Sequence, residues 1–487
     1  MVFNSLQFVA FFLVVYGLYR LLPHRPQNWL LLVGSYYFYA AWDWRFLGLL
    51  VASTVIDFCC ARYIASRQAP RDRKIALLVS ISFNVSMLGF FKYFNFFADN
   101  LHALFGLVGW RLDFFTLRVL LPIGISFYTF ITMSYVIDVY RRHIEPTRNF
   151  LDFAVFVAYF PHLVAGPILR ASVLLPQIAA ARRITREQNI EGAWLIGWGL
   201  FKKMFVADNL ARVAGAVFAP AGHPSGLEVL LGVYAFAFQI YGDFSGYTDI
   251  ARGVSKLMGI ELNINFRSPY FVRTPQEFWQ HWHISLSTWL RDYLFLPLSY
   301  AFSRRLDGVR WLGLRDDFWI YAAATMITML IAGLWHGAAW NFVLWGAYQG
   351  LLLVLFTVPW GGRKRKRAGA AARRPFVRAL GVLGMFHLTC LGWLIFRARS
   401  IAQIGALFGD LAGRFEPSGR VLAALGLPLL FYAGPLVAVH AFEAAHDDFA
   451  VVFRWPRIVR YNVYAALIYL IVLFGDFAGA QFIYFQF

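Results

Sequence analysis

The chain has 487 residues, of which 60% are hydrophobic, 19% aromatic and only 15% charged, and this composition excludes a soluble multidomain protein. The net charge of +19 does not indicate nucleic-acid binding, because the Lys and Arg residues lie between apolar runs and form no separate basic domain. It fits the positive residues of cytoplasmic loops. Since apolar runs that can cross a bilayer recur along the chain, we expect an all-α, polytopic integral membrane protein.

Apolar runs in the first part of the chain predict a series of membrane spans. The first is expected to be retained, because it lacks the basic start and the cleavage site of a signal peptide. Basic clusters at residues 62–74 and 141–142 are assigned to the cytoplasmic side. In the last of these spans, Pro122 and Gly124 predict a broken or closely packed helix. The spans expected here are residues 5–22, 46–64, 75–97 and 119–140, and residues 29–41, which are short for a full crossing, are expected to form a tilted or partial span.

The middle of the chain carries polar residues inside apolar runs. Residues 150–168 are interrupted by proline and glycine between two basic clusters, so we expect a re-entrant segment. Residues 190–218 include Asp208, and residues 227–247 include Asp243. A carboxylate in or beside a membrane helix is costly unless it caps a helix, forms an ion pair or faces a polar cavity. A structural role for Asp243 therefore stays open beside a role in binding.

A first polar motif begins with a helix-start signal. Residues 274–277 form a capping box with proline at the first helical position. Residues 274–293 then place Trp282 and other apolar residues on one face and polar residues on another, which predicts one amphipathic helix. His283 lies on this helix. Because an amphipathic helix has wet positions at which a histidine needs no function, both a structural and a functional role stay open for it.

A second motif, Gly-Leu-Trp-His-Gly at residues 333–337, lies inside an apolar run. An imidazole at membrane depth costs free energy unless it is paired or used, so His336 is a functional candidate. Gly333 and Gly337 let a neighbouring helix approach closely, and Asn341 can offer a hydrogen bond one turn later. In such a slot a neutral histidine can take the proton of a hydroxyl that attacks an activated acyl carbon. The alternative is a buried histidine that only bonds a backbone carbonyl.

The remaining apolar runs bring the total to about 11 or 12 spans. They are residues 318–335, 339–358, 379–396, 421–442 and 459–475. Residues 361–378 are rich in Lys and Arg and contain no acid, so we expect a basic cytoplasmic loop that contacts anionic lipid. No soluble domain and no internal repeat is visible, so residues 1–487 are treated as a single transmembrane domain.

Signals for other enzyme chemistry are missing from the sequence. It has no Gly-x-Ser-x-Gly nucleophile motif, no glycine-rich phosphate loop with Lys and no His-Glu-x-x-His pair. Cys59, Cys60 and Cys390 lack metal-ligand spacing and are expected to be buried packing residues. We therefore expect no bound metal, and acid/base chemistry at a histidine is what remains.

The two motifs together resemble those of the membrane-bound O-acyltransferase family. They are Trp-His-Ile-Ser-Leu-Ser-Thr-Trp at residues 282–289 and Leu-Trp-His-Gly at residues 334–337. The likeness is strongest to the bacterial branch formed by the membrane subunits of alginate O-acetyltransferases, and it runs over nearly the whole chain. Further segments that look like this branch are residues 121–127, 135–140, 165–168, 242–247 and 484–487.

The resemblance implies a ring of tilted transmembrane helices, with re-entrant and amphipathic helices, around a central tunnel in the bacterial inner membrane. It implies that His336 is the catalytic histidine. His283 corresponds to the second, more variable histidine of the family and is also treated as catalytic. The residues assigned to substrate binding are Asp208, Asp243, Trp282, Trp335 and Asn341.

The resemblance also implies a reaction. An acetyl group would pass from a cytoplasmic thioester, most simply acetyl-CoA, to an exported polysaccharide such as alginate or cellulose, with no bound cofactor. The basic inner face would suit the phosphates of acetyl-CoA. Since the chain has no soluble sugar-binding domain, a separate extracytoplasmic partner protein is expected to complete the transfer. Peptidoglycan O-acetylation, D-alanyl transfer by the same fold, and a polysaccharide or lipid transporter are the alternatives.

Overall fold

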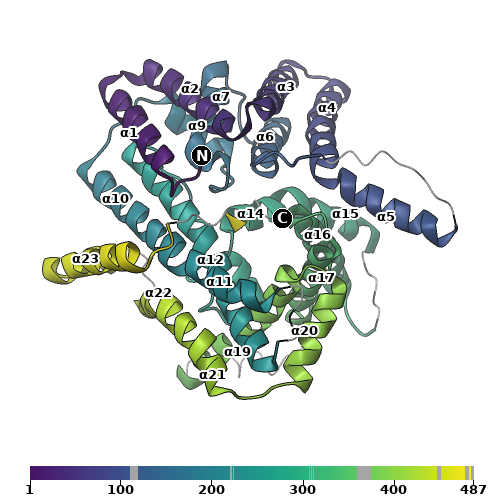
Figure 1. Ribbon diagram of the computed structural model, residues 1–487. Helices are drawn as coiled ribbons and strands as arrows, with labels where there is room; N and C mark the ends of the chain where they lie inside the picture. Colours follow the sequence, from purple (N-terminus) through teal and green to yellow (C-terminus); the bar gives the residue numbers. More distant parts are fainter. Residues whose placement is uncertain are drawn as a thin grey trace. The chain divides into compact units, whose positions relative to one another are not determined.

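The computed structural model describes residues 1–109, 119–219, 222, 224–306, 308, 310, 312–358, 375–446, 451–477 and 482–483. Within these residues the regular secondary structure is helical and no β-strand occurs, as expected (Figure 1). The chain divides into two compact units. The first comprises residues 1–196 and 247–263, and the second comprises residues 197–246 and 264–487. The prediction of a single transmembrane domain over residues 1–487 stays a prediction.

Within the described ranges, seven helical runs are long and apolar enough to cross a membrane, and three shorter helices are also apolar. The seven are His24–Ser66, Pro70–Leu107, Gly226–Leu257, Asp316–His336, Phe376–Arg397, Gly419–His446 and Arg457–Phe474. Two of them have 43 and 38 residues, roughly twice the ~20 residues that one crossing needs. Seven is therefore a count of continuous runs rather than of crossings. The multi-pass membrane fold is confirmed, whereas the 11 or 12 crossings stay a prediction.

Apolar side chains cover much of the outside of these helices. Leu6, Ile458 and Leu473 are all well exposed on the first and last helices of the chain. Exposed apolar surface on this scale is unfavourable in water and is typical of a surface that faces lipid. Cys59 is exposed and Cys60 half-buried, so the prediction that all cysteines are buried packing residues holds only for Cys390.

The first unit contains the N-terminal helices. They are α1 (Leu6–Leu21), α2 (His24–Asp43), η1 (Trp44–Phe46), α3 (Leu47–Ser66), α4 (Pro70–Leu88), η2 (Gly89–Tyr93), α5 (Phe94–Leu107), α6 (Ile125–Tyr140), α7 (Phe150–Ala158), α8 (Phe160–Leu163), α9 (Ala171–Ala179) and most of α10 (Arg186–Leu200). The end of α12 also belongs to it.

The two irregular segments of the first unit have physical causes. Helix α6 begins only after Gly124, whose φ of +77° is left-handed. A Cβ at Gly124 would lie 2.7 Å from the carbonyl oxygen of Leu163, so the broken, closely packed start is confirmed. In the segment predicted to be re-entrant, α7 and α8 have nine and four residues and are almost entirely buried. Neither helix is long enough to cross the bilayer by itself.

The second unit contains the rest of the chain. Its elements are η3 (Phe201–Ala207), α11 (Asp208–Val217), the first part of α12 (Gly226–Leu257), α13 (Pro275–His281), α14 (Ile284–Leu290), η4 (Arg291–Phe295), α15 (Leu296–Leu306), α16 (Asp316–His336), α17 (Trp340–Leu355), α19 (Pro375–Arg397), α20 (Ile401–Gly413), α21 (Gly419–Val421), η5 (Leu422–Gly426), α22 (Leu427–His446), η6 (Val451–Arg454) and α23 (Arg457–Phe474). Residues 361–374 of the basic segment and residues 484–487 lie outside the described residues.

Helices α16 and α17 form a hairpin whose backbones touch (Figure 1). A Cβ at Gly333 of α16 would collide with the carbonyl oxygen of Phe342, and one at Gly346 of α17 would collide with that of Met329. A Cβ at Gly337 would meet the ring of Phe342. The expected close approach at Gly333 and Gly337 is confirmed, and it fixes the end of α16, where His336 lies.

Candidate active site

The amphipathic helix predicted over residues 274–293 is in fact two short helices. Its start is as expected, because the Thr274 hydroxyl accepts a hydrogen bond of 3.1 Å from the N–H of Glu277. Helix α13 ends at His281, however, and α14 begins at Ile284. Between them, His283 adopts φ 43° and ψ 53°, the left-handed conformation that non-glycine residues rarely adopt. The prediction of one continuous helix was wrong.

The segment before α13 holds this break in place. The N–H of Arg267 donates to the carbonyl of His281, and the N–H of Ile284 donates to the carbonyl of Asn265, both over 3.0 Å. The side-chain oxygen of Asn265 accepts from the N–H and the hydroxyl of Ser285, over 3.1 and 2.9 Å. The backbone groups at the ends of the two helices thus have hydrogen-bond partners. The break therefore leaves fewer buried polar groups unsatisfied and costs less free energy.

The break buries His283 completely. Its side chain has no exposed surface, so it does not occupy a wet position of an amphipathic helix. Its ring centroid lies 4.6 Å from that of Phe244, 6.4 Å from that of Phe266 and 5.7 Å from that of Trp335. Burial lowers the pKa of His283 to about 3, so its imidazole is neutral at physiological pH.

His336 is the last residue of α16, and its ring contacts the rings of Trp335, Trp345 and Phe396. Only 5% of it is exposed. Its ring lies 5.0 Å from Trp335, 5.0 Å from Trp345 and 5.3 Å from Phe396, and all three contacts are edge-to-face. The indole of Trp335 therefore contacts both histidines. The structure brings His283, Trp335 and His336 together, although they come from α16 and from the break before α14.

Asn341 and Trp282 contact neighbours of this site, and substrate binding by either residue stays a prediction. The side-chain amide of Asn341 donates to the carbonyls of Phe396 and Ala398, over 3.2 and 2.9 Å. Asn341 thus holds the end of α19, which carries Phe396, instead of offering those hydrogens to His336 as expected. Trp282 is buried in an aromatic cluster, with its ring stacked on Phe278 at 5.6 Å.

Asp208 and Asp243 form a buried ion-pair cluster with Lys203. The Lys203 ammonium lies 2.8 Å from Asp208 Oδ1 and 2.8 Å from Asp243 Oδ1. The other oxygen of Asp243 accepts a hydrogen bond of 2.7 Å from the N–H of Ile483. These contacts match the ion-pairing role that stayed open for Asp243. Substrate binding by either carboxylate stays a prediction.

A cavity of about 180 Å³ borders the site on the side of α13 and α14. Its lining is mostly apolar and includes Trp279, whose ring lies 5.9 Å from that of Trp345. The other lining residues are Ser287, Leu290, Arg291, Phe295, Tyr321, Thr325, Thr328, Met329 and Leu353. In the described parts of the chain, no group of three or more His, Cys, Asp or Glu residues is arranged to hold a metal.

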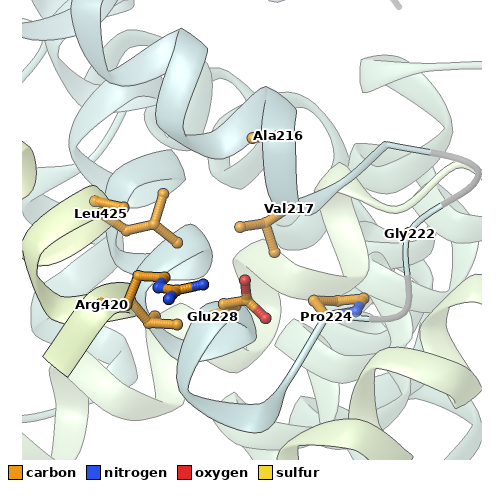
Figure 2. A pocket seen from close by; sticks show the side chains of 9 residues that line it. Ala216, Val217, Gly222, Pro224, Glu228, Arg420 and Leu425 are labelled. Carbon is orange, nitrogen blue, oxygen red and sulfur yellow. The ribbon is translucent and has the colours of Figure 1, made fainter. Parts of the chain in front are cut away.

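A second cavity, of about 350 Å³, lies at the junction of α11, α12 and α21 (Figure 2). Figure 2 shows the side chains of Glu228 and Arg420 directed into it. Glu228 also caps α12, since its carboxylate accepts from the N–H and the hydroxyl of Ser225 over 2.7 and 2.9 Å. None of the residues that line this cavity is a predicted site residue.

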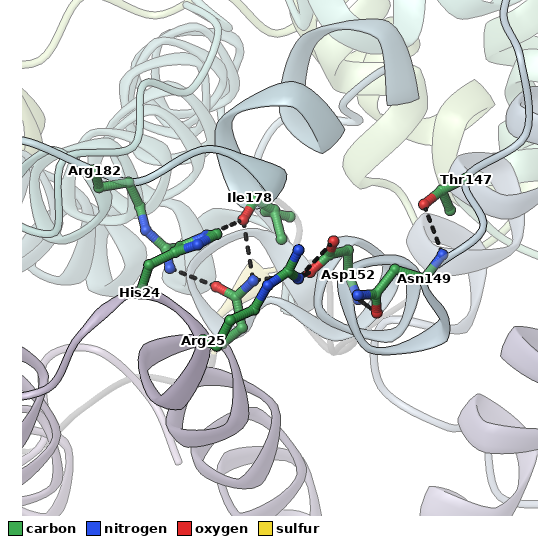
Figure 3. Close-up of polar contacts among 8 residues, drawn as sticks. His24, Arg25, Thr147, Asn149, Asp152, Ile178 and Arg182 are labelled. Atoms are coloured by element: carbon green, nitrogen blue, oxygen red, sulfur yellow. Dashed lines mark hydrogen bonds and ion pairs between the residues drawn. The ribbon is translucent and has the colours of Figure 1, made fainter.

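A polar cluster in the first unit links three of its helices (Figure 3). Asp152 of α7 accepts hydrogen bonds from Arg25 and Asn28 of α2, over 2.9 Å each. Asn28 also donates to the carbonyl of Ile178 in α9, and His24 Nε2 lies 2.8 Å from the same oxygen. The buried carboxylate of Asp152 has both an ion-pair partner and hydrogen-bond donors. This is the arrangement expected of a carboxylate with a structural role.

The class of protein follows from a match to a known family. The profile of the membrane-bound O-acyltransferase family matches residues 37–394, a stretch that includes both histidines and Trp335. The chain belongs to this family. It is therefore an O-acyltransferase, and the resemblance stated from the two motifs is confirmed.

Proteins with different described activities resemble the chain. A probable alginate O-acetylase of Azotobacter vinelandii is 41% identical over 403 residues, which are 82% of this chain and 76% of the relative. A peptidoglycan O-acetyltransferase of Helicobacter pylori is 34% identical over 450 residues, 85% of this chain and 80% of the relative. A teichoic acid D-alanyltransferase of Streptococcus thermophilus is 29% identical, over 56% of this chain and 68% of the relative.

Sequence reasoning missed part of this candidate site. Trp345, Phe396 and Phe244 all contact one of the histidines, yet none was singled out. Each lies in an apolar segment, where an aromatic residue normally packs against other helices or lipid and gives no separate signal. The one available hint was Gly346, because a glycine beside Trp345 inside an apolar helix indicates a close helix contact.

Proposed function

We propose that this protein is an acetyltransferase of the bacterial inner membrane that O-acetylates an exported polysaccharide such as alginate or cellulose. The 41% identity to an alginate O-acetylase over most of both chains supports the acetyl group and the polysaccharide acceptor. The assignment of the site rests on Trp335, because its ring contacts both histidines. Through this contact the buried imidazole of His283, from the first motif, lies beside the Trp-His pair of the second motif.

In this proposal His336 is the general base. Its imidazole takes the proton of the acceptor hydroxyl while the oxygen attacks the carbonyl carbon of acetyl-CoA. The C–S bond then breaks, the thiolate takes up the proton from the imidazolium, and an O-acetyl ester and free CoA are released. Burial of the reacting groups excludes water, which would otherwise hydrolyse the thioester. General-base catalysis of this kind contributes roughly 10²- to 10⁴-fold in rate.

His283 acts differently in this proposal. With a pKa of about 3 it stays neutral, so it cannot supply an imidazolium near neutral pH. It positions Trp335 and the acyl donor through packing and one ring N–H. The donor enters from the cytoplasm, and an extracytoplasmic partner protein or the polysaccharide itself carries the accepting hydroxyl. The charge of +19 favours approach of the anionic donor.

Peptidoglycan O-acetylation is the second candidate function. A peptidoglycan O-acetyltransferase that shares 34% identity over 85% of this chain favours it. It needs the same donor and the same histidine, so only the acceptor differs. D-alanyl transfer has weaker support, because the D-alanyltransferase relative matches only 56% of the chain. Membership in an acyltransferase family favours an enzyme over the alternative of a polysaccharide or lipid transporter.

The test removes the imidazole of His336 in cells that lack the native gene. We expect the wild-type gene to restore acetyl groups per sugar on the exported polymer. His336→Ala should abolish them while total export and the amount of folded protein stay unchanged. His446→Ala is the matched control, because this exposed histidine lies at the end of α22.

Three other results of this experiment would each contradict part of the proposal. Retained acetylation with His336→Ala contradicts the proposed mechanism. Loss of polymer export with unchanged acetylation per sugar would point back to a transporter. Loss of acetyl groups from peptidoglycan, with the exported polysaccharide unchanged, identifies the second candidate function.

A further inference from the structure

Trp345 has a buried hydrogen-bond donor that nothing in the described part of the chain uses. The residue is 0% exposed, and its indole N–H has no hydrogen-bond partner there. One helical turn later on α17, the side-chain oxygen of buried Gln349 also lacks a partner among the described residues. An unsatisfied buried polar group costs about 1–3 kcal/mol, so two on one helix face require an explanation.

The ring of Trp345 belongs to the aromatic shell around His336. The ring of Trp345 meets that of His336 edge-to-face at 5.0 Å and that of Phe396 at 5.3 Å. Gln349 follows Trp345 by four residues on α17 and so lies on the same helix face. A site that binds a polar ligand has buried polar atoms without a protein partner, because the ligand supplies the missing hydrogen bond. Such atoms beside a reactive imidazole therefore indicate a ligand site.

A neighbouring tryptophan shows that the cluster can satisfy an indole. Trp393 is also buried, and its ring is stacked on that of Trp345 at 6.2 Å. Its N–H donates a hydrogen bond of 3.1 Å to the hydroxyl of Tyr270, which in turn donates to the carbonyl of Ala237. The two stacked indoles therefore differ in whether a described residue accepts their N–H. Trp279, whose ring lies 5.9 Å from that of Trp345, also has no acceptor for its indole N–H among the described residues, but no contact of its ring with His336 is seen.

We propose that the indole N–H of Trp345 donates a hydrogen bond to the acyl oxygen of the thioester donor and stabilises the oxyanion formed during transfer. This inference rests on the proposed acetyl transfer at His336. When the acceptor oxygen attacks, the C=O bond becomes a C–O⁻ single bond, and the proton of the hydroxyl passes to His336. Collapse of this intermediate re-forms C=O, breaks C–S and returns the proton to the leaving sulfur.

A donor that is already buried and unbonded suits this task. It needs no reorganisation when the charge develops, and the low dielectric strengthens the interaction. An indole N–H can only donate, so it matches a carbonyl or oxyanion and no positive group. Removing one such donor from an enzyme costs roughly 10²- to 10³-fold in kcat.

The test replaces single tryptophans by 3-benzothienylalanine, in which sulfur takes the place of the indole N–H and the ring shape is kept. In purified full-length protein supplied with acetyl-CoA, we expect replacement at Trp345 to lower kcat roughly 10²- to 10³-fold with little change in the KM for acetyl-CoA. The melting temperature should stay equal or rise, because an unsatisfied buried donor is removed.

The same replacement at Trp393 is the matched control. There it breaks the hydrogen bond to Tyr270, so the melting temperature should fall while kcat per folded molecule stays within about twofold of the wild type. Wild-type kcat after replacement at Trp345 overturns the inference. A fall in kcat that only parallels a loss of folded protein overturns it as well.

Trp345→Phe is the second variant, since it removes the same N–H by ordinary mutagenesis. It should also lower kcat far more than it changes KM. His336→Ala, measured alongside, separates this inference from the proposed function. An active His336→Ala protein contradicts the proposed function itself, whereas an inactive His336→Ala with an unaffected Trp345 variant contradicts only the role of Trp345.

Discussion

Trp335 is the residue that makes one site out of two sequence motifs. Its ring lies 5.7 Å from His283 and 5.0 Å from His336, although the histidines are 53 positions apart. The motifs indicated each histidine separately, and Trp335 was included among the candidates. No pattern in the sequence indicated that the tryptophan contacts both, because this contact depends on the backbone turn at His283.

The depressed pKa of His283 predicts an acid-sensitive contribution to stability. Its pKa is about 3 in the folded protein and about 6.5 in an unfolded chain, so between these values the unfolded state binds more protons. Stability from this residue is therefore complete above pH 6.5 and falls by up to about 1.4 kcal/mol per pH unit as the pH decreases toward 3.

Melting temperatures of the wild type and of His283→Asn, measured from pH 8 to pH 4, check this expectation. The variant should be less stable at pH 8, because it loses buried packing, but its melting temperature should fall less steeply below pH 6.5. Parallel curves for the two proteins would show that His283 is not held neutral by the fold.

At the scale of elements, the α16–α17 hairpin sets the distance between His336 and Trp345. A side chain at Gly333 would push the carbonyl of Phe342 away, and backbone at such a contact cannot rotate aside. Gly333→Ala should therefore lower stability by about 1–3 kcal/mol and reduce activity, because the two rings move apart. Thermal unfolding and acetyl transfer of the purified protein measure both effects.

Gly384→Ala is the control for this prediction. Gly384 lies inside α19, and a Cβ there would meet no atom within 4 Å. Alanine has a higher helix propensity than glycine, so this change should leave stability equal or slightly improved. A Gly333→Ala protein as stable and active as Gly384→Ala would contradict the close-packing argument.

At the first polar motif the sequence predicted the start of a helix but not its end. The capping box at Thr274 predicted the start of α13 correctly, because a cap is a local interaction. The end at His281 was missed, since apolar residues continue at helical spacing through residues 282–293 and hide the break. What stabilises the break is Asn265, some twenty residues away from Ser285, and such a tertiary contact has no signature in the local pattern.

For the whole molecule, composition and motifs predicted the all-α membrane fold and the family, because apolar length and a family motif need no tertiary information. They could not predict which buried charges meet. Asp243 contacts Lys203 and, through its other oxygen, the N–H of Ile483, which is 240 positions later. Contacts over such distances come from the folded chain, so the role of Asp243 was left open.

A charge-removal series distinguishes structure from binding at this cluster. Lys203→Met leaves two buried carboxylates without their cation and should destabilise the protein by about 3–5 kcal/mol. Adding Asp208→Asn and Asp243→Asn removes every charge of the cluster and should restore most of that stability. Lys203 pairs with one oxygen of each carboxylate, and the N–H of Ile483 with the other oxygen of Asp243, so if the cluster is only structural the restored triple variant transfers acetyl groups with an unchanged KM for the acceptor. A triple variant that melts like the wild type but shows a KM raised about tenfold would instead establish that these carboxylates bind the substrate.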